Sequence, residues 1–319
     1  MSMNPQTLFI LIVAFTILPV IVSMIMETLR KPPETPQSLY WNSTIPIAYT
    51  TIDGIRIRYI KTGQGPNLVL LHTLRTELDI FQKVIPDLAQ NFTVYALDYP
   101  GHGFSDIPKT DYRPELFIHV VERFLDHMNI NEATVAGISI GGAISLVIAA
   151  KHNPRVKKVV SINPYDYGKG LGIRRGNFVA ALLFTLAKIP VLGDTVMRFR
   201  NPMIEGLVMR GGVAAAEALP QKFLEQLFAE GLRKGHYSAF LNLIRNAHHW
   251  EDARQVYSQI NIPVLVVYGD RDWSRADERQ RTVKAIPGAK VETVANGGHF
   301  LSLDQPESVV TLIKEFALA

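Results

Sequence analysis

Ser139 stands at the centre of a G-x-S-x-G pattern, between the short apolar run 134–136 and a helical sequence that begins at Ala143. At a junction between a strand and a helix, this pattern is typical of a tight turn that lifts the serine hydroxyl clear of the sheet. The start of the following helix then lies beneath the hydroxyl. These residues predict a serine nucleophile that forms a covalent intermediate.

Such a serine needs a general base, because its hydroxyl attacks poorly at neutral pH unless an imidazole accepts the proton. His299 fits this role. It lies in the glycine-rich loop 295–300, after the short apolar run 291–294 and before a final helix expected from Pro306 onward. His248 and His249 lack the H-E-x-x-H spacing of a metal site, so we expect no metal there.

The chain resembles the α/β-hydrolase superfamily at these two motifs. The serine pattern is similar to the family's nucleophile elbow, and the loop around His299 is similar to its catalytic histidine loop. The sequence DYPGHGFS at 98–105 also resembles the family's D-x-P-G-x-G-x-S loop. The resemblance runs from about residue 50 to the C-terminus, with 165–260 unmatched. It implies an α/β-hydrolase fold and catalysis by a serine, a histidine and an acid.

By the same resemblance, Asp272 is the acid of the triad. It ends the sequence GDRD, which follows the apolar run 264–268 and matches the family's G-x-x-D pattern. A buried carboxylate holds the imidazole in one tautomer and stabilises its protonated form. Asp166 is the alternative, because some family members place the acid after an earlier strand.

Two backbone N–H groups are expected to bind the oxyanion of the reaction. The elbow supplies one from Ile140, and the resemblance assigns the other to Leu74. The family usually has His-Gly before this second donor, whereas this chain has His72-Thr73. A β-branched residue disfavours positive φ, so the loop departs from the family pattern. Arg75 is expected either to be solvated or to contact an acidic group of a substrate.

The elements that position these residues follow an α/β pattern. Residues 55–60 alternate apolar and polar side chains after a turn at Asp53-Gly54, which predicts a hairpin at the sheet edge. Residues 115–129 have the spacing of an amphipathic helix. Short apolar runs with little alternation suit a parallel sheet covered on both faces; these are 68–71, 94–97, 134–136, 159–162 and 264–268. The pattern predicts a mostly parallel, doubly wound α/β domain over 47–164 and 261–319.

Between 165 and 260 the strand pattern stops, and apolar helical segments with glycine and proline breaks replace it. We interpret this stretch as a helical cap inserted into the sheet. Most of its apolar side chains are expected in the cap's own core, and some are expected to face the site beneath it.

The N-terminus predicts a single transmembrane helix within 1–30. The run 8–26 has no charged side chain, and a helix of that length spans a hydrocarbon core of about 30 Å. Pro19 would kink it, which membrane helices tolerate. A cleaved signal peptide is the alternative, although no positive charge precedes the run. Arg30 and Lys31 favour a catalytic domain on the cytoplasmic side of a single-pass membrane protein. Residues 31–46, rich in proline and polar side chains, suggest an extended spacer.

Composition excludes several classes of function. The net charge is +4 and the pI is near 9.1, but Lys and Arg are scattered along the chain, which disfavours nucleic-acid binding. The chain has no cysteine, so a disulfide framework, a cysteine nucleophile and a thiolate metal site are excluded. Nucleotide-binding motifs are absent. We therefore expect neither a metal nor an organic cofactor, while the oligomeric state stays open.

The expected activity is hydrolysis of a carboxylic ester through an acyl-enzyme. An apolar cap and a membrane segment favour a hydrophobic or lipid-like small-molecule ester. The same triad also supports carbon–carbon bond hydrolysis, thioester or amide hydrolysis, and cofactor-free perhydrolysis. Dehalogenases and epoxide hydrolases of this fold use an aspartate at the elbow, so Ser139 argues against both. A non-catalytic receptor or scaffold is the alternative from another class.

Overall fold

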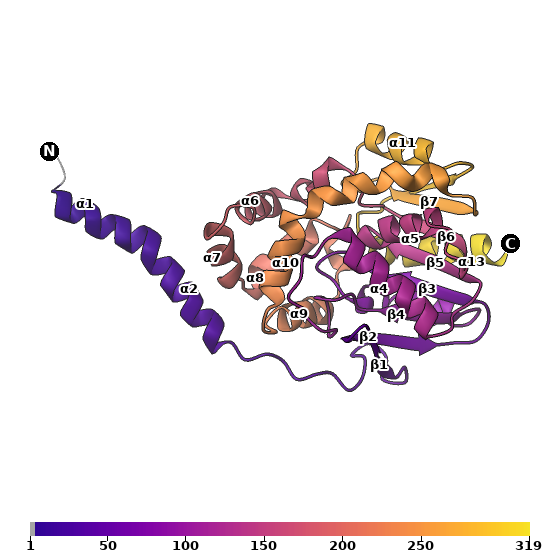
Figure 1. Ribbon diagram of the computed structural model, residues 1–319, viewed down its shortest axis with the longest axis horizontal. Coiled ribbons are helices and arrows are strands. Elements are labelled where there is room, and N and C mark those ends of the chain that lie inside the picture. The colour runs from indigo at the N-terminus through magenta and orange to yellow at the C-terminus, as the bar shows by residue number, and fades with distance from the viewer. Residues whose placement is uncertain (1–3) are drawn as a thin grey trace.

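The computed structural model describes residues 4–319, in which a central sheet carries helices on its flanks and a helical arm extends from the N-terminus (Figure 1). Within these residues one sheet of eight strands has the order β1-β2-β4-β3-β5-β6-β7-β8. The strands are β1 Ile47–Ile52, β2 Ile55–Thr62, β3 Asn67–Leu71, β4 Thr93–Leu97, β5 Ala133–Ile138, β6 Val156–Ile162, β7 Val264–Gly269 and β8 Lys290–Val294. The β1–β2 and β2–β4 pairs are antiparallel and the others are parallel, which confirms the predicted mostly parallel sheet.

Burial explains the unbroken apolar runs seen in the sequence. Every residue of β5 and β7 is buried, because these strands have neighbours on both sides and helices above and below. The hairpin of β1 and β2 turns at Asp53 and Gly54, which have φ of 47° and 82°. Positive φ at both positions is the requirement of the tight turns that match the twist of paired strands.

The helices of the core form two groups, and helices within each group contact one another. In the first group, α5 packs on β5 and β6 and contacts α4. In the second group, α3 contacts α13 and α12 contacts the 3-10 helix η2. Their bounds are η2 Leu78–Phe81, α3 Ile85–Leu88, α4 Pro114–His127, α5 Ile140–Ala150, α11 Ala276–Ala285, α12 Leu301–Asp304 and α13 Pro306–Leu318.

The described stretch between β6 and β7 contains helices and no strand. It lies at the end of the sheet nearer the N-terminal arm (Figure 1). Its helices are η3 Gly168–Gly170, η4 Gly172–Arg175, α6 Phe178–Leu186, α7 Leu192–Arg198, α8 Pro202–Arg210, η5 Ala216–Ala218, α9 Gln221–Glu230, α10 His236–Arg245 and η6 Ala247–Gln259. We call this segment the cap.

Residues 31–46 carry neither helix nor strand, apart from an isolated bridge between Ser38 and Pro46. They are nevertheless held on the core. Leu39 and Ile45 are buried, and the indole N–H of Trp41 donates to Asp79 Oδ1 at 2.6 Å. The predicted spacer is therefore extended along the surface of the domain.

The N-terminal segment differs from the predicted single transmembrane helix. It is divided into α1 Pro5–Ile12, the π-helix η1 Val13–Ile17 and α2 Leu18–Leu29. In the part of the chain that the structure describes, no helix has the length and apolar character needed to span a membrane. The division has a local cause, because Pro19 lacks the N–H of a regular helix and the turn before it widens to a π-helix. Residues 1–3 of the predicted anchor lie outside the described residues.

Candidate active site

The elbow holds Ser139 between the end of β5 and the start of α5. Its backbone has φ 62° and ψ −118°, which is unfavourable for a residue with a side chain. The glycines on either side are required by close packing. A Cβ on Gly137 would lie 2.1 Å from Gly141 O, and a Cβ on Gly141 would lie 2.1 Å from Leu71 O. The G-x-S-x-G pattern is thus needed for the backbone to make this turn.

Ser139, His299 and Asp272 form one hydrogen-bonded chain. His299 Nε2 lies 2.8 Å from Ser139 Oγ, and His299 Nδ1 lies 2.5 Å from Asp272 Oδ1. The carboxylate is an acceptor, so Nδ1 donates to Asp272 and Nε2 accepts from the serine hydroxyl. All three side chains are buried. The imidazole is therefore in the tautomer that removes a proton from serine.

The environment of Asp272 favours its charged form. Burial acts to raise the pKa of this carboxyl, but His299 and hydrogen bonds from Ser274 together hold it below the usual range. Ser274 donates its N–H to Asp272 Oδ2 at 2.8 Å and also donates its hydroxyl. The acid can thus stay ionised while buried beside the imidazole.

Asp166, the alternative acid, lies elsewhere. Its two carboxyl oxygens accept the Thr282 hydroxyl at 2.9 and 3.0 Å. Burial raises its pKa to about 7. The structure therefore brings Asp272, and not Asp166, to the imidazole of His299.

Asn163 ties the loops of the acid and the histidine together, a role that the sequence did not reveal. Its amide donates to Gly298 O at 3.0 Å and His299 O at 3.1 Å, and its Oδ1 accepts from Gly269 N at 2.9 Å. Its φ of 45° lies in the left-handed region, which asparagine tolerates better than most residues.

We expect Asn163→Ala to lower the free energy of unfolding by roughly 3 kcal/mol, because three buried hydrogen bonds are lost and alanine disfavours the left-handed conformation. Urea denaturation measures the change. Asn67→Ala is the matched control, because it removes one exposed hydrogen bond to Asn131 O. Equal effects of the two substitutions would contradict the role given to Asn163.

Trp273 is a second position that sequence reasoning missed. Its ring stacks on the His299 imidazole, with centroids 3.8 Å apart and planes inclined by 14°. Its indole N–H donates to Gly211 O in the cap at 2.6 Å. The residue therefore packs against the plane of the His299 imidazole and connects it to the cap. The feature of the sequence that could have identified Trp273 is its position next to Asp272.

We expect Trp273→Leu to lower kcat roughly tenfold with little change in KM, because the aromatic face no longer orients the imidazole or stabilises its protonated form. Trp273→Phe keeps an aromatic face and loses the hydrogen bond to Gly211, so it should retain most of the activity. Steady-state kinetics on a soluble ester measures both variants. A loss in Trp273→Phe as large as in Trp273→Leu would assign the effect to the hydrogen bond.

The first of the two expected oxyanion donors lies in the elbow, directly after Ser139. Ile140 is the first residue of α5, so its N–H has no acceptor within the helix. In the loop of Leu74, the left-handed residue is Arg75 with φ 59°, and Thr73 does not have positive φ. The threonine is thus accommodated without the strain that the sequence suggested. His72 donates from Nδ1 to Thr73 O at 2.7 Å, and its Nε2 accepts from Tyr99 N at 3.1 Å.

Arg75 is neither solvated nor free to meet an acidic substrate, so the expectation of a solvated loop charge is wrong. Its guanidinium forms ion pairs with Glu205 at 2.8 Å and Glu230 at 3.1 Å, both from the cap. Burial acts to raise the pKa of Glu230, and the Arg75 guanidinium beside it acts to lower it. These contacts fasten the cap to the loop that carries Leu74.

The cap also closes over the histidine loop. Phe300 N donates to Gly212 O at 2.7 Å, and Asp304 accepts from Ala214 N at 2.9 Å. Ser139 has no exposed surface. Substrate must therefore reach the serine through the cap or after part of the cap moves.

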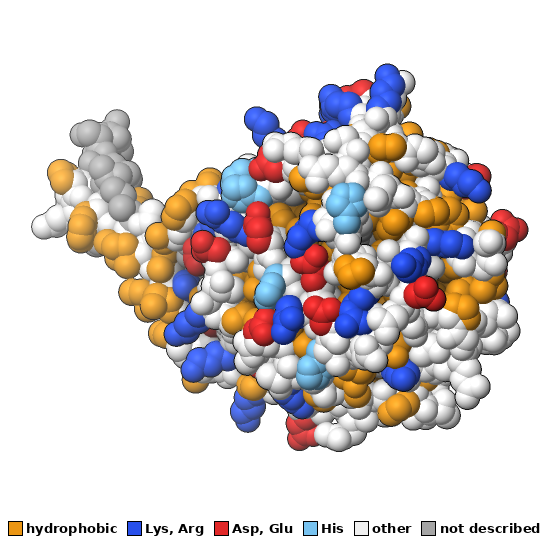
Figure 2. Space-filling model, turned by 45° about the vertical axis from the view of Figure 1, so that its right-hand side comes forward, with side chains coloured by type: hydrophobic (Ala, Val, Ile, Leu, Met, Phe, Trp, Pro, Cys, Tyr) orange, Lys and Arg blue, Asp and Glu red, His pale blue; other side chains and the backbone are white. Residues whose placement is uncertain are grey.

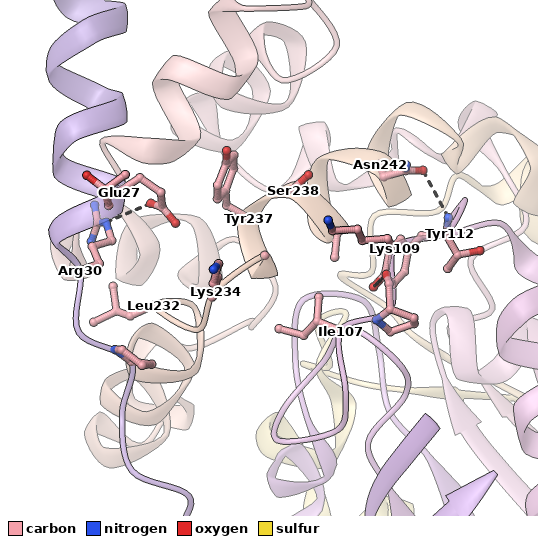
Figure 3. Close-up of a pocket in the computed structure, with 16 residues that line it drawn as sticks. Glu27, Arg30, Ile107, Lys109, Tyr112, Leu232, Lys234, Tyr237, Ser238 and Asn242 are labelled. Carbon is pink, nitrogen blue, oxygen red and sulfur yellow. Dashed lines mark hydrogen bonds and ion pairs between the residues drawn. The ribbon is translucent and has the colours of Figure 1, made fainter. Parts of the chain in front are cut away.

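An apolar cavity of about 200 Å³ lies inside the cap. Ten of its fourteen lining residues are apolar. Arg75, the neighbour of Leu74, is one of the four polar ones. A wider cavity of about 890 Å³ lies between the end of α2, α10 and the loop around Lys109 (Figure 3). None of Ser139, Asp272 and His299 lines either cavity, but Arg75, next to Leu74, lines the smaller one and not the wider one. The smaller cavity is therefore the better candidate for binding substrate. Among residues 4–319, no group of three His, Cys, Asp or Glu is arranged to hold a metal ion.

The chain is similar to known proteins in sequence and in structure. Residues 66–306 match the family model described as alpha/beta hydrolase fold. A haloalkane dehalogenase of Psychrobacter cryohalolentis is 27% identical, with 82% of this chain and 87% of the relative covered. The 3-oxoadipate enol-lactonase 2 of Acinetobacter baylyi is 26% identical, with 81% and 91% covered. The crystal structure of Cfl2 from Burkholderia cenocepacia superposes with a TM-score of 0.77 at 21% identity, covering 89% of this chain and 99% of that one.

Proposed function

Because the chain belongs to the alpha/beta hydrolase fold family, we propose that it is a serine hydrolase that cleaves carboxylic esters through an acyl-enzyme. One observation carries the proposal: Ser139 Oγ, His299 Nε2 and Nδ1, and Asp272 Oδ1 form a continuous hydrogen-bonded chain at the elbow. That arrangement allows proton removal from the serine as it attacks.

In the acylation step, Ser139 Oγ attacks the ester carbonyl carbon while His299 Nε2 takes the hydroxyl proton. The carbonyl oxygen becomes an oxyanion, which the N–H groups of Ile140 and Leu74 stabilise. The tetrahedral intermediate collapses when the bond to the alcohol oxygen breaks and His299 returns the proton to that oxygen. The alcohol leaves, and the acyl group stays on Ser139.

In the deacylation step, His299 takes a proton from water, whose oxygen attacks the acyl carbon. A second tetrahedral intermediate forms at the same donors. Its collapse breaks the bond to Ser139 Oγ, which recovers the proton from His299, and releases the carboxylic acid. Asp272 stays ionised and stabilises the imidazolium in both steps.

Two observations favour an ester over the other bonds that this family cleaves. The first is that the elbow carries serine, whereas family members that act on halides and epoxides use aspartate. The second is that the enol-lactonase relative is named for the hydrolysis of a lactone, which is a cyclic ester. The apolar lining of the cap cavity favours a hydrophobic acyl or alcohol group.

Esters of one alcohol with acyl chains of increasing length test the proposal. The substrates are kept below their micelle concentrations, so that chain length alone changes. We expect kcat/KM to rise by about threefold to fourfold for each added methylene until the cavity is filled. A steady fall of kcat/KM from the acetate onward would contradict a hydrophobic substrate. Turnover of none of the esters by folded protein would contradict esterase activity itself.

A further inference from the structure

Exposed apolar side chains are concentrated in two segments. Of the 21 large apolar side chains exposed in the described structure, 11 lie between Phe9 and Leu29 and eight between Phe178 and Leu207. The other two are Val291 and Leu318. Exposed apolar residues are normally scattered, and a gathered set marks an interaction site.

The two segments adjoin each other. α2 packs against α7, and Arg200 in the cap binds both carboxyl oxygens of Glu27 at 2.7 and 3.1 Å. The guanidinium of Arg30 donates to the carbonyls of Arg198 and Arg200. Figure 1 shows α6, α7 and α8 on the side of the body that faces the arm. In Figure 2, apolar side chains follow the arm onto the adjoining edge of the body.

The loop between α6 and α7 exposes an apolar side chain at a position where the backbone is strained. Val191 has φ 65°, which β-branched residues rarely adopt. Its side chain is 61% exposed. Strain that is combined with exposure of an apolar group points to a function for the group outside the folded chain.

The charge of the cap segment suits an anionic partner. Between Gly168 and Gly212 there are seven Lys and Arg; Arg175 and Arg200 pair with Glu278 and Glu27, and the other five form no ion pair in the described structure. Lys109 and Lys234 add positive charge to the lining of the cavity at the end of α2 (Figure 3). Apolar side chains together with basic residues are the combination that binds surfaces of anionic lipid.

The apolar cavity of the cap lies among the same helices. Its walls include Phe184 from α6, Met197 from α7 and Val208 from α8, and Arg75 is part of its lining. A hydrophobic ester that enters this cavity at α6–α8 would lie against Arg75, which is in the same loop as Leu74.

We propose that the arm of α1 to α2 and the cap helices α6–α8 form one lipid-docking surface, through which esters dissolved in an anionic bilayer enter the cap cavity. The arm and the cap helices lie on the surface of the bilayer in this arrangement. The docking surface is independent of catalysis, whereas the entry of lipid esters rests on the proposed function.

The docking surface is tested with single-cysteine variants of the full chain, which has no cysteine of its own. Phe178→Cys on α6 and Met203→Cys on α8 replace side chains that are 80% and 70% exposed. Leu318→Cys is the matched control, because it is 50% exposed and α13 lies at the opposite end of the molecule (Figure 1). Each thiol carries a polarity-sensitive fluorophore, and the protein is mixed with vesicles of phosphatidylglycerol and phosphatidylcholine.

We expect a blue shift and at least a doubling of fluorescence at positions 178 and 203, none at 318, and a smaller response with phosphatidylcholine alone. If positions 178 and 203 respond no more than 318, the cap is not a docking surface, even where a label at Phe15→Cys responds. Apolar surroundings at 178 and 203 before vesicles are added would show that a second copy covers this face, which also overturns the proposal.

Entry of lipid esters is tested with the combined variant Phe178→Ser, Val191→Ser, Met203→Ser. We expect hydrolysis of a long-chain ester within anionic vesicles to fall at least about tenfold, because three apolar contacts with the lipid are lost. Hydrolysis of a short, soluble ester should stay unchanged. Equal rates of wild type and variant on the vesicle substrate would overturn the proposal. If wild type hydrolyses neither ester, the proposed function fails, while the fluorescence result still decides the docking surface.

Discussion

Ser139→Ala lowers kcat/KM for a carboxylic ester by about ten-thousandfold or more, because the covalent intermediate no longer forms. The oxyanion donors and the cavity remain, so a residual rate above that of water is expected. The loss should fall on kcat, since the hydroxyl that alanine lacks makes no contribution to substrate binding. Initial rates with a soluble ester at high enzyme concentration measure the residual activity.

Ser145→Ala is the matched control for this prediction. Ser145 is buried in α5, the helix that follows Ser139, and its hydroxyl donates to Gly142 O at 2.8 Å. We expect its activity to stay within about threefold of wild type. A reduction of less than about tenfold in Ser139→Ala, with intact protein, would show that another group performs the attack.

Asp272→Asn is expected to lower kcat by about a thousandfold to ten-thousandfold. The carboxylate accepts the Nδ1 proton of His299, whereas the amide NH2 of asparagine donates to Nδ1 and moves the imidazole proton to Nε2. Nε2 then cannot accept the proton of Ser139. Asp166→Asn is the control, because Asp166 contacts Thr282 instead of the imidazole. If Asp166→Asn lost more activity than Asp272→Asn, the assignment of the acid would be reversed.

The same carboxyl links stability to pH. Its folded-state pKa lies below the usual range, since contacts with His299 and Ser274 outweigh the effect of burial. The contribution to the free energy of unfolding is therefore complete above the unfolded pKa of about 3.9 and is lost as pH falls through the folded pKa. Urea denaturation at pH 7 and at pH 3 should show a larger gap between wild type and Asp272→Asn at pH 7.

Much of the fold could be predicted, because a sequence in which unbroken apolar runs alternate with helical patterns has few stable arrangements. The strands β3 to β7 follow such runs, and the parallel order brings their carboxyl ends to one edge. Ser139 and His299 could be named for the same reason, since their loops follow β5 and β8 and carry the required chemistry. Asp272 required the resemblance to a family.

The features that the sequence did not reveal depend on contacts between distant segments. Arg75 and Glu230 are 155 positions apart, so nothing local shows that the arginine would be buried and paired. Trp273 stacks on His299, which lies in a different loop of the chain. The apolar N-terminal run was correctly expected to be helical, but its division at the π-helix depends on backbone geometry around Pro19.

Reaction with an alkyl fluorophosphonate tests the activated serine most directly, because fluoride leaves only when a nucleophilic oxygen attacks phosphorus. We expect one adduct on the peptide that contains Ser139, formed in wild type and absent from both Ser139→Ala and His299→Ala. The alkyl chain suits the apolar cavity of the cap. Folded wild-type protein that takes no label, or that is labelled equally in Ser139→Ala, would contradict the proposed hydrolase.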